Sequence, residues 1–367
     1  MNYRTLPLLL LTLLCASVRA QKEDTKTENV IIITMDGLRW QELFGGAVDS
    51  MVMNPDLTSD ADRIKASYIS DSQEERKASL MPFFWETIAT QGQVFGNRWL
   101  GSQVNCTNRY WFSYPGYNEI LTGYTDGAIN SNAKNWNPNK TVLEWLHEKP
   151  EFQGRVAAFG SWDVFDWIVN EQRSGIPVNS GYNKAEGDQL TDKEHYLNKL
   201  QDQTALLWGS VRQDFLTHNY MMEYLKREHP KVVYISYGET DDFAHDGAYH
   251  RYLDAAHATD GMWRELWTFL QNDPVYAGKT SLIITTDHGR GESPMTEWKS
   301  HGTRIKGADA IWMAVLGPDT PAKGVITQGQ LYQTQIAKTA AALLGYDYVN
   351  EKEEVGAVVP GVIATKK

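Results

Sequence analysis

The chain has 367 residues and a formal net charge of −11, and 42% of its residues are hydrophobic and 11% aromatic. This length fits one large domain or two smaller ones. The excess of acidic residues argues against a nucleic-acid polymer as the main partner, because the surface as a whole repels a polyanion.

The first twenty residues have the pattern of a signal peptide. Arg4 gives a basic start, residues 8–14 form an apolar core, and Val18-Arg19-Ala20 matches a cleavage site. We therefore expect residues 1–20 to be removed and the protein to be periplasmic or secreted. The rest of the chain has no apolar run long enough to cross a bilayer, so we expect no membrane span.

Apolar and β-branched runs alternate with helical patterns along the rest of the chain. The runs predict strands at residues 30–34, 155–159, 232–237, 282–286 and 311–316. Apolar residues spaced three or four apart predict helices, most clearly at residues 252–270 and 331–344. We therefore expect an α/β fold with a mostly parallel central sheet and helices on both faces.

The predicted strands also indicate the domain organisation. Side chains suited to chemistry follow three of the five strands, which favours a single domain over residues 21–367. The polar stretch at residues 177–204 indicates a surface excursion between strands. We therefore expect a small cap insertion around residues 163–230.

Acidic and imidazole side chains gather at or shortly after the ends of three predicted strands. Taken one at a time, each is more simply a helix cap or a hydrogen-bonded polar group. As an ordered set, three carboxylates and three imidazoles suit two divalent metal ions. The histidines favour zinc, and manganese stays open. The set consists of Asp36, Asp241, His245, Asp287, His288 and His301.

A candidate nucleophile lies between the first two of these residues. Ser113 precedes a Tyr-Pro-Gly turn and a stretch with helical spacing. This pattern places its hydroxyl near a helix amino terminus, where free N–H groups and the helix dipole favour an anion. A nearby divalent cation would hold the serine as an alkoxide. The simpler interpretation is a capping serine.

Taken in chain order, these residues resemble the alkaline phosphatase superfamily, and most closely its nucleotide pyrophosphatase/phosphodiesterase branch. In that branch a turn T-F-P-N-H-Y opens at a Thr or Ser, and here the turn runs over residues 113–118 with Thr122-Gly123 in register. The resemblance implies an alkaline-phosphatase-like fold. It also implies one ion surrounded by Asp36, Ser113, Asp287 and His288, and a second ion held by Asp241, His245 and His301.

The same resemblance implies an Asn that binds a non-bridging phosphoryl oxygen. Asn130 matches this position best, and Asn132 is the alternative. Gly116 stands where the family motif has an Asn, so any contact from that position is lost. Two aromatic residues, Trp162 and Tyr114, are our candidates for the wall around a leaving group.

The expected function is a secreted, metal-dependent phosphoester hydrolase of the phosphodiesterase or nucleotide pyrophosphatase type, with a small phosphoester as substrate and a phosphoserine intermediate on Ser113. Tyr117 stands where sulfatases of the superfamily carry the Arg of their modification signal, which disfavours sulfate esters. Two alternatives stay open, a phosphomonoesterase of the same superfamily and a catalytically silent protein that binds a phosphate-bearing ligand. A phosphomonoesterase needs cations near the metal ligands for the extra anionic oxygen of a monoester. The candidates are Arg39, Arg290, Lys299 and Arg304. The sequence leaves the oligomeric state open.

Overall fold

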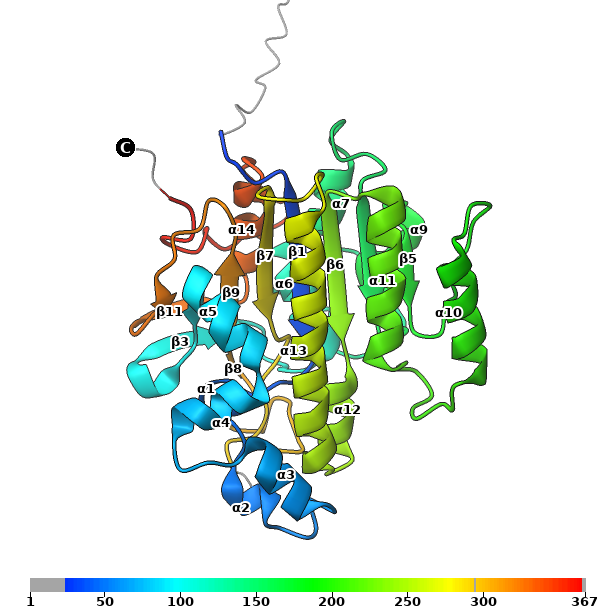
Figure 1. Cartoon of the computed structure of the whole chain (residues 1–367). Coiled ribbons are helices and arrows are strands. Elements are labelled where there is room, and N and C mark those ends of the chain that lie inside the picture. Colours follow the sequence, from blue (N-terminus) through cyan, green and yellow to red (C-terminus); the bar gives the residue numbers. More distant parts are fainter. Residues whose placement is uncertain (1–23, 294, 365–367) are drawn as a thin grey trace, which may run out of the picture.

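The computed structural model describes residues 24–293 and 295–364 (Figure 1). The expected signal peptide, residues 1–20, lies outside the described residues. Within them, every helix is too short or too polar to cross a membrane.

A central sheet, eight-stranded over the described residues, runs through the middle of the structure (Figure 1). From one edge to the other its strands are β10 (Gly324–Val325), β2 (Gln93–Phe95), β9 (Met313–Leu316), β7 (Thr280–Thr285), β1 (Asn29–Met35), β6 (Val232–Tyr237), β4 (Val156–Gly160) and β5 (Val178–Ser180). Among these described strands only β9 pairs antiparallel with its neighbours, so the expected mostly parallel sheet is confirmed. A smaller sheet consists of β11 (Gly329–Tyr332), β3 (Ser102–Asn105) and β8 (Ala310–Ile311).

Helices cover both faces of the central sheet, as expected (Figure 1). One face carries α11 (Asp214–Glu228) and α13 (Tyr249–Asn272), and the other carries α6 (Ser113–Thr122), α7 (Val142–His147) and α14 (Gln335–Leu343). Successive residues of β1 join the two different cores, with Ile31 in the first and Ile32 in the second. Because both faces of the strand are buried, its sequence is an apolar run without alternation.

Further helices connect the strands. Before β2 they are α1 (Trp40–Gly45), α2 (Asp49–Val52), α3 (Ala61–Tyr68), α4 (Gln73–Leu80), the π-helix η1 (Phe84–Ile88) and α5 (Ala89–Gln91). Later in the chain they are the 3-10 helix η2 (Arg98–Leu100), α8 (Phe165–Val169), α9 (Glu171–Ser174), α10 (Asp192–Gln203) and α12 (Glu239–His245). Of these, α12 matters most for the site, because it follows directly on the central strand β6.

Each of the five predicted strand runs overlaps a strand, and the predicted helix 252–270 lies within α13. The run 311–316, predicted as one strand, is divided between β8 and β9, which belong to different sheets. The predicted helix 331–344 begins only at Gln335, because Leu331 and Tyr332 pair with β3 as part of β11. The segment 163–230, expected to form a cap, contains β5, which pairs with β4 and extends the main sheet. β5 has only three residues, too few to show a strand period in the sequence.

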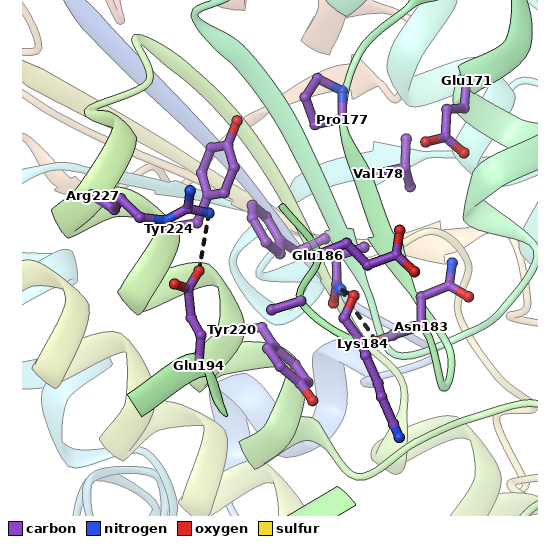
Figure 2. A pocket seen from close by; sticks show the side chains of 13 residues that line it. Glu171, Pro177, Val178, Asn183, Lys184, Glu186, Glu194, Tyr220, Tyr224 and Arg227 are labelled. Carbon is purple, nitrogen blue, oxygen red and sulfur yellow. Dashed lines mark hydrogen bonds and ion pairs between the residues drawn. The ribbon is translucent and has the colours of Figure 1, made fainter. Parts of the chain in front are cut away.

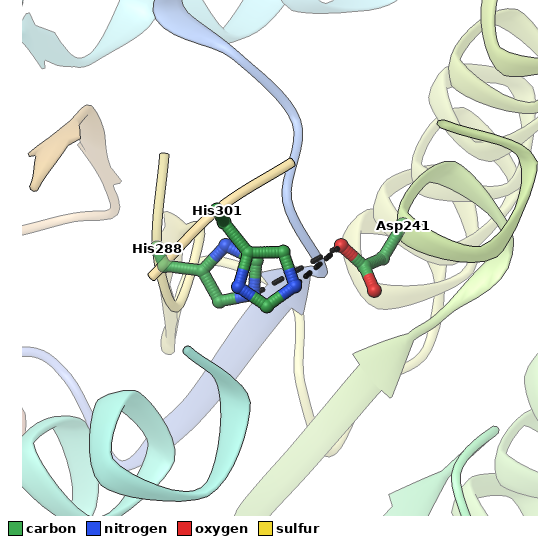
Figure 3. Close-up of side chains that lie close together, drawn as sticks. All are labelled: Asp241, His288 and His301. Carbon is green, nitrogen blue, oxygen red and sulfur yellow. Dashed lines mark ion pairs between the residues drawn. The ribbon is translucent and has the colours of Figure 1, made fainter. Parts of the chain in front are cut away.

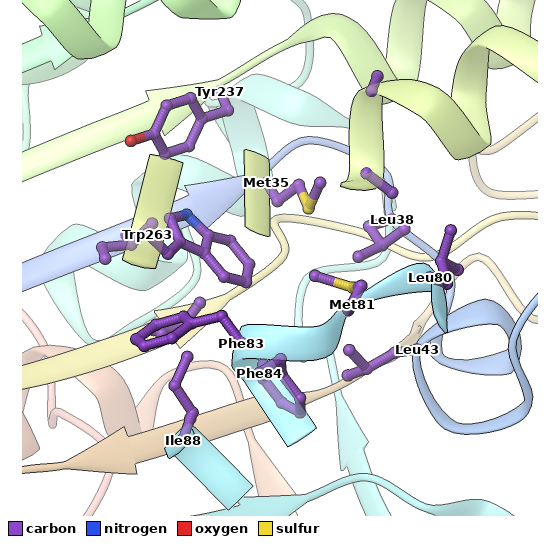
Figure 4. Packing of buried hydrophobic residues seen from close by; sticks show 14 of the residues in the cluster. Met35, Leu38, Leu43, Leu80, Met81, Phe83, Phe84, Ile88, Tyr237 and Trp263 are labelled. Carbon is purple, nitrogen blue, oxygen red and sulfur yellow. The ribbon is translucent and has the colours of Figure 1, made fainter. Parts of the chain in front are cut away.

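The carboxylate of Asp260, on α13, fixes the start of η1. Its two oxygens accept hydrogen bonds from the backbone N–H groups of Phe83 and Phe84, each at 2.7 Å. Both phenylalanines pack with Trp263 in the buried cluster between the sheet and α13 (Figure 4). The carboxylate therefore satisfies two donors that no water reaches.

Replacing Asp260 by Ala is expected to lower the free energy of unfolding by about 2 to 4 kcal/mol, because two buried N–H groups lose their acceptors. Urea unfolding followed by circular dichroism measures this change. The matched control is Asp254→Ala on the same helix, whose carboxylate pairs with Arg63 at the surface. Asp254→Ala should lower the free energy of unfolding by less than about 1 kcal/mol. Equal losses in the two variants would contradict the assignment.

Candidate metal centre

The carboxyl ends of three central strands bring the predicted ligands together. β1 lies between β6 and β7 and is parallel to both, so all three strands end at the same edge of the sheet. Asp36 follows β1, Asp287 follows β7 after one further residue, and Asp241 lies in the first turn of α12, just beyond β6. Side chains far apart in the sequence thus share one small space.

A first group consists of Asp36, Asp287 and His288, whose ligand atoms lie within 4.8 Å of one another. His288 Nε2 is 3.3 Å from Asp36 Oδ1 and 3.3 Å from Asp287 Oδ2. The hydroxyl of Ser113 lies 3.5 Å from the same nitrogen. All four side chains are buried.

A second group consists of Asp241, His288 and His301 (Figure 3). Asp241 Oδ1 lies 3.7 Å from His301 Nε2 and 3.9 Å from His288 Nε2. His245, which is more exposed, places its Nε2 atom 3.1 Å from Asp241 Oδ2 and 2.9 Å from His301 Nε2. The structure therefore gathers all seven predicted ligands, and His288 lies near both groups.

The electrostatics of these carboxylates fit divalent cations. Asp36 Oδ1 and Asp287 Oδ2 are buried and have no hydrogen-bond partner among the described residues. Burial, followed by the charge of Asp241, raises the pKa of Asp36 well above its usual value. Burial, followed by the charge of Asp36, does the same for the pKa of Asp287. Two such oxygens facing one imidazole nitrogen need positive charge between them.

Asp241 differs from the other two carboxylates. Burial acts to raise the pKa of Asp241, but the Arg290 guanidinium and the His245 imidazole outweigh it and hold the pKa well below its usual value. Arg290 is itself buried, donates to Asp241 Oδ1 and donates from Nε to the Trp298 carbonyl at 2.7 Å. The second group thus keeps an ionised carboxylate beside two imidazoles.

Comparisons with known proteins place this geometry in a wider context. No protein-family model matches the chain. GPI ethanolamine phosphate transferase 1 from Mus musculus is 24% identical over 247 residues, which are 66% of this chain and 24% of that protein. The chain thus spans about a quarter of the length of this relative.

Solved structures resemble the chain over most of its length. Alkaline phosphatase PafA has a TM-score of 0.58 at 11% identity, covering 93% of this chain and 99% of that one. The alkaline phosphatase fold is therefore the fold of this chain. Two further structures share this fold. A putative sulfatase from Bacteroides thetaiotaomicron has a TM-score of 0.57 at 13% identity, covering 93% of this chain and 76% of that one. The lipoteichoic acid synthase LtaP from Listeria monocytogenes has a TM-score of 0.56 at 12% identity, covering 89% of this chain and 74% of that one. The fold that the predicted resemblance implies is therefore confirmed.

Within the alkaline phosphatase fold, Ser113 is the first residue of α6 and follows Phe112, which has an extended backbone. One turn later, Tyr117 donates a hydrogen bond to Asp36 Oδ2 at 2.7 Å, and Ser236 donates to the Tyr117 hydroxyl oxygen at 3.0 Å. The sequence indicated Tyr117 only as a departure from the sulfatase signal and not as a partner of a metal ligand. Its spacing of four residues from Ser113 places both on one helix face, which is the signal that could have revealed it.

Gly116 allows α6 to approach the end of β7. A Cβ atom at this position would lie 2.4 Å from the Asp287 carbonyl oxygen, which is closer than any side chain permits. The family motif has an Asn here, so the helix of this chain lies closer to the Asp287 backbone than an Asn would allow. Gly116 therefore contributes to the site by letting α6 lie close to the backbone of Asp287, and not by a contact with a ligand.

Asn130 and Asn132, the two candidates for the phosphoryl contact, are both exposed. Asn132 Oδ1 accepts a hydrogen bond from Tyr114 N at 3.0 Å, which places Asn132 at the amino terminus of α6. Tyr114 itself is buried and donates from its hydroxyl to the Asn135 carbonyl at 2.6 Å, so its ring belongs to the core. Trp162, half-buried at the end of β4, packs edge-on against Phe165 and stays a candidate.

A cavity of about 370 Å³ lies at the far edge of the sheet, beside β5, α10 and α11 (Figure 2). Its walls include Val178, Tyr220 and Tyr224, and the ion pair of Glu194 with Arg227 spans 3.0 Å beside it. None of the seven predicted ligands lines this cavity. The cavity is therefore separate from the candidate metal centre.

Proposed function

We propose that the protein is a metal-dependent phosphodiester hydrolase with Ser113 as its nucleophile. The observation that supports this most directly is the position of the serine hydroxyl, at a helix amino terminus and 3.5 Å from His288 Nε2. Beside it lie two buried carboxylate oxygens with no hydrogen-bond partner in the described part of the chain. This arrangement suits attack by an activated hydroxyl on an anionic ester.

The donor set fits two divalent ions, for which zinc is the first choice. Asp36, Ser113, Asp287 and His288 would hold one ion, and Asp241, His245 and His301 the other. When bound, the ions would supply positive charge that favours the ionised serine and stabilises the departing oxygen. Tyr117 holds one oxygen of Asp36, which leaves Oδ1 turned towards His288.

Residues of the chain itself carry out the bond changes and bind the phosphoryl group. Ser113 Oγ forms a bond to phosphorus while the bond from phosphorus to the leaving oxygen breaks, giving a phosphoserine that still carries the second ester group of the diester. Water then attacks the phosphorus, and the bond to Ser113 Oγ breaks. The Asn132 amide uses its oxygen for Tyr114 N, so its NH₂ group, which has no partner among the described residues, can donate to a non-bridging phosphoryl oxygen.

Replacing Asn132 by Ala should lower kcat by about a hundredfold, because the developing charge loses one donor. Asn130→Ala is the matched control, two residues away on the same exposed loop, and should leave kcat within about twofold. Steady-state kinetics on a nitrophenyl diester with saturating zinc measures both. If Asn130→Ala gave the larger loss, the assignment of the two residues would have to be reversed.

Diesters are favoured over monoesters because two nearby cations are committed elsewhere. Arg39 is buried and pairs with Glu42, and Arg290 is buried and pairs with Asp241. A monoester carries an extra anionic oxygen that needs such a cation. The test is hydrolysis of nitrophenyl phosphate beside its alkyl diester at equal metal, and faster cleavage of the monoester would overturn the preference.

Transfer of the phosphoryl group to an alcohol is a second candidate function. It is favoured by the curated relative, whose name is that of an ethanolamine phosphate transferase. Adding an alcohol acceptor to the diester assay separates the two functions, because a transferase would form a new diester at the expense of the hydrolysis product. Burst release of nitrophenol from excess ester would argue against a silent binding protein.

We also propose that the protein is exported. Mass spectrometry that finds a mature chain beginning at Gln21 would support this.

A further inference from the structure

We infer that Asn108 is a positioning residue for His301 and acts through the backbone carbonyl of Trp111. The inference rests on the proposed function, because it assigns a support to one of the proposed metal ligands. A connected series of hydrogen bonds carries it, from the middle of α6 to the imidazole of His301.

The series begins at Glu119, which is fully buried in α6. Its carboxylate accepts hydrogen bonds from Thr107 N, Asn108 N and Asn108 Nδ2, each at 2.8 Å. A buried carboxylate with three donors is held in one position and holds its donors in turn. The loop before Ser113 is therefore tied to the helix that Ser113 begins.

The side chain of Asn108, held by Glu119, in turn holds the backbone of Trp111. Its Oδ1 atom accepts hydrogen bonds from Tyr110 N and Trp111 N, both at 3.0 Å. Trp111 has a φ of +51°, in the left-handed region that a bulky residue rarely adopts. Such a conformation persists only where its surroundings hold it, and the Asn108 side chain is the group that does so here.

The strained backbone directs the Trp111 carbonyl at the metal centre. His301 Nδ1 lies 3.2 Å from this oxygen and donates to it. The proton on Nδ1 leaves the lone pair on Nε2, the atom that faces Asp241 and His245. A histidine that binds a metal through one nitrogen is oriented by the hydrogen bond of the other.

The experiment measures zinc binding to the full-length protein by competition with a chromophoric chelator. Asn108→Ala should weaken one of the two ions about 10- to 100-fold and leave the other unchanged. Asn108→Ser, whose hydroxyl can accept from the same backbone N–H groups, should recover part of the loss. Glu119→Gln is a second route to the same loss, because an NH₂ group would replace one of the two accepting oxygens and face one or two of the three donors.

A double-mutant cycle separates positioning from a general structural role. In the His301→Ala background, Asn108→Ala should change zinc affinity less than twofold, because the ligand that it supports is gone. The inference fails if Asn108→Ala leaves both ions at wild-type affinity, or if its effect is the same in the two backgrounds. Either result leaves the proposed function standing, which fails instead if Ser113→Ala keeps full turnover.

Discussion

Replacing Ser113 by Ala is expected to reduce turnover of a phosphodiester by at least about a thousandfold, because the hydroxyl that forms the proposed covalent intermediate is lost. The side chain is buried and lies 3.5 Å from His288 Nε2, so its loss removes the only proposed point of attack. Zinc content should stay at two ions, because three carboxylates and three imidazoles remain. Single-turnover kinetics and metal analysis on the same sample measure both quantities.

Ser113→Thr is the matched control for this result. It keeps a hydroxyl at the start of α6 and adds one methyl group at a position that is 6% exposed. We expect it to retain measurable turnover and to accumulate a phosphothreonine when hydrolysis is stopped by acid. Full activity of Ser113→Ala, or a labelled phosphoryl group on a different residue, would remove the covalent step from the mechanism.

Asp241→Asn is expected to weaken the second ion at least about a hundredfold, because the site loses its anionic ligand and keeps only two neutral imidazoles. Turnover should fall in parallel at low zinc and recover partly when zinc is added in excess. The change also leaves the buried Arg290 guanidinium without its carboxylate partner, which adds to the loss. Titration with zinc, followed by activity and by calorimetry, measures the effect.

Asp246→Asn is the matched control, since it removes the same charge one residue beyond α12. Asp246 is exposed and accepts a hydrogen bond from Trp208 Nε1 at 3.3 Å. Its replacement should leave zinc affinity and turnover within about twofold, as surface substitutions usually do. Two tightly held ions in Asp241→Asn would mean that this carboxylate is not a ligand.

The ends of the central strands could be predicted because their signals are local. Strands buried on both faces appear as apolar runs, and parallel neighbours end at one edge, so Asp36, Asp241 and Asp287 could be expected to meet there. The ligand order then led to the resemblance, and the fold that it implied is confirmed. The proposed grouping around two ions follows from that order and not from any single motif.

Other features depend on packing that no local pattern reports. Asn132 rather than Asn130 reaches α6 because of the path of the loop, and either spacing fits the sequence. The burial of Arg290 and its pairing with Asp241 could not be predicted, because Asp241 lies 49 residues earlier in the chain, in α12. The three residues of β5 join the sheet through pairing with β4, which outweighs their weak strand propensity.

The position of β1 has a consequence for how the chain folds. This strand is synthesised early, but its partners on both sides come late, with Val30 beside Val232 on one edge and Ser281 on the other. Until those residues leave the ribosome, an apolar strand has two open edges, which invites aggregation. Such long-range pairing slows folding. For the export proposed above, slow folding would keep the nascent chain unfolded until a translocation channel accepts it, and a holding chaperone would protect it meanwhile.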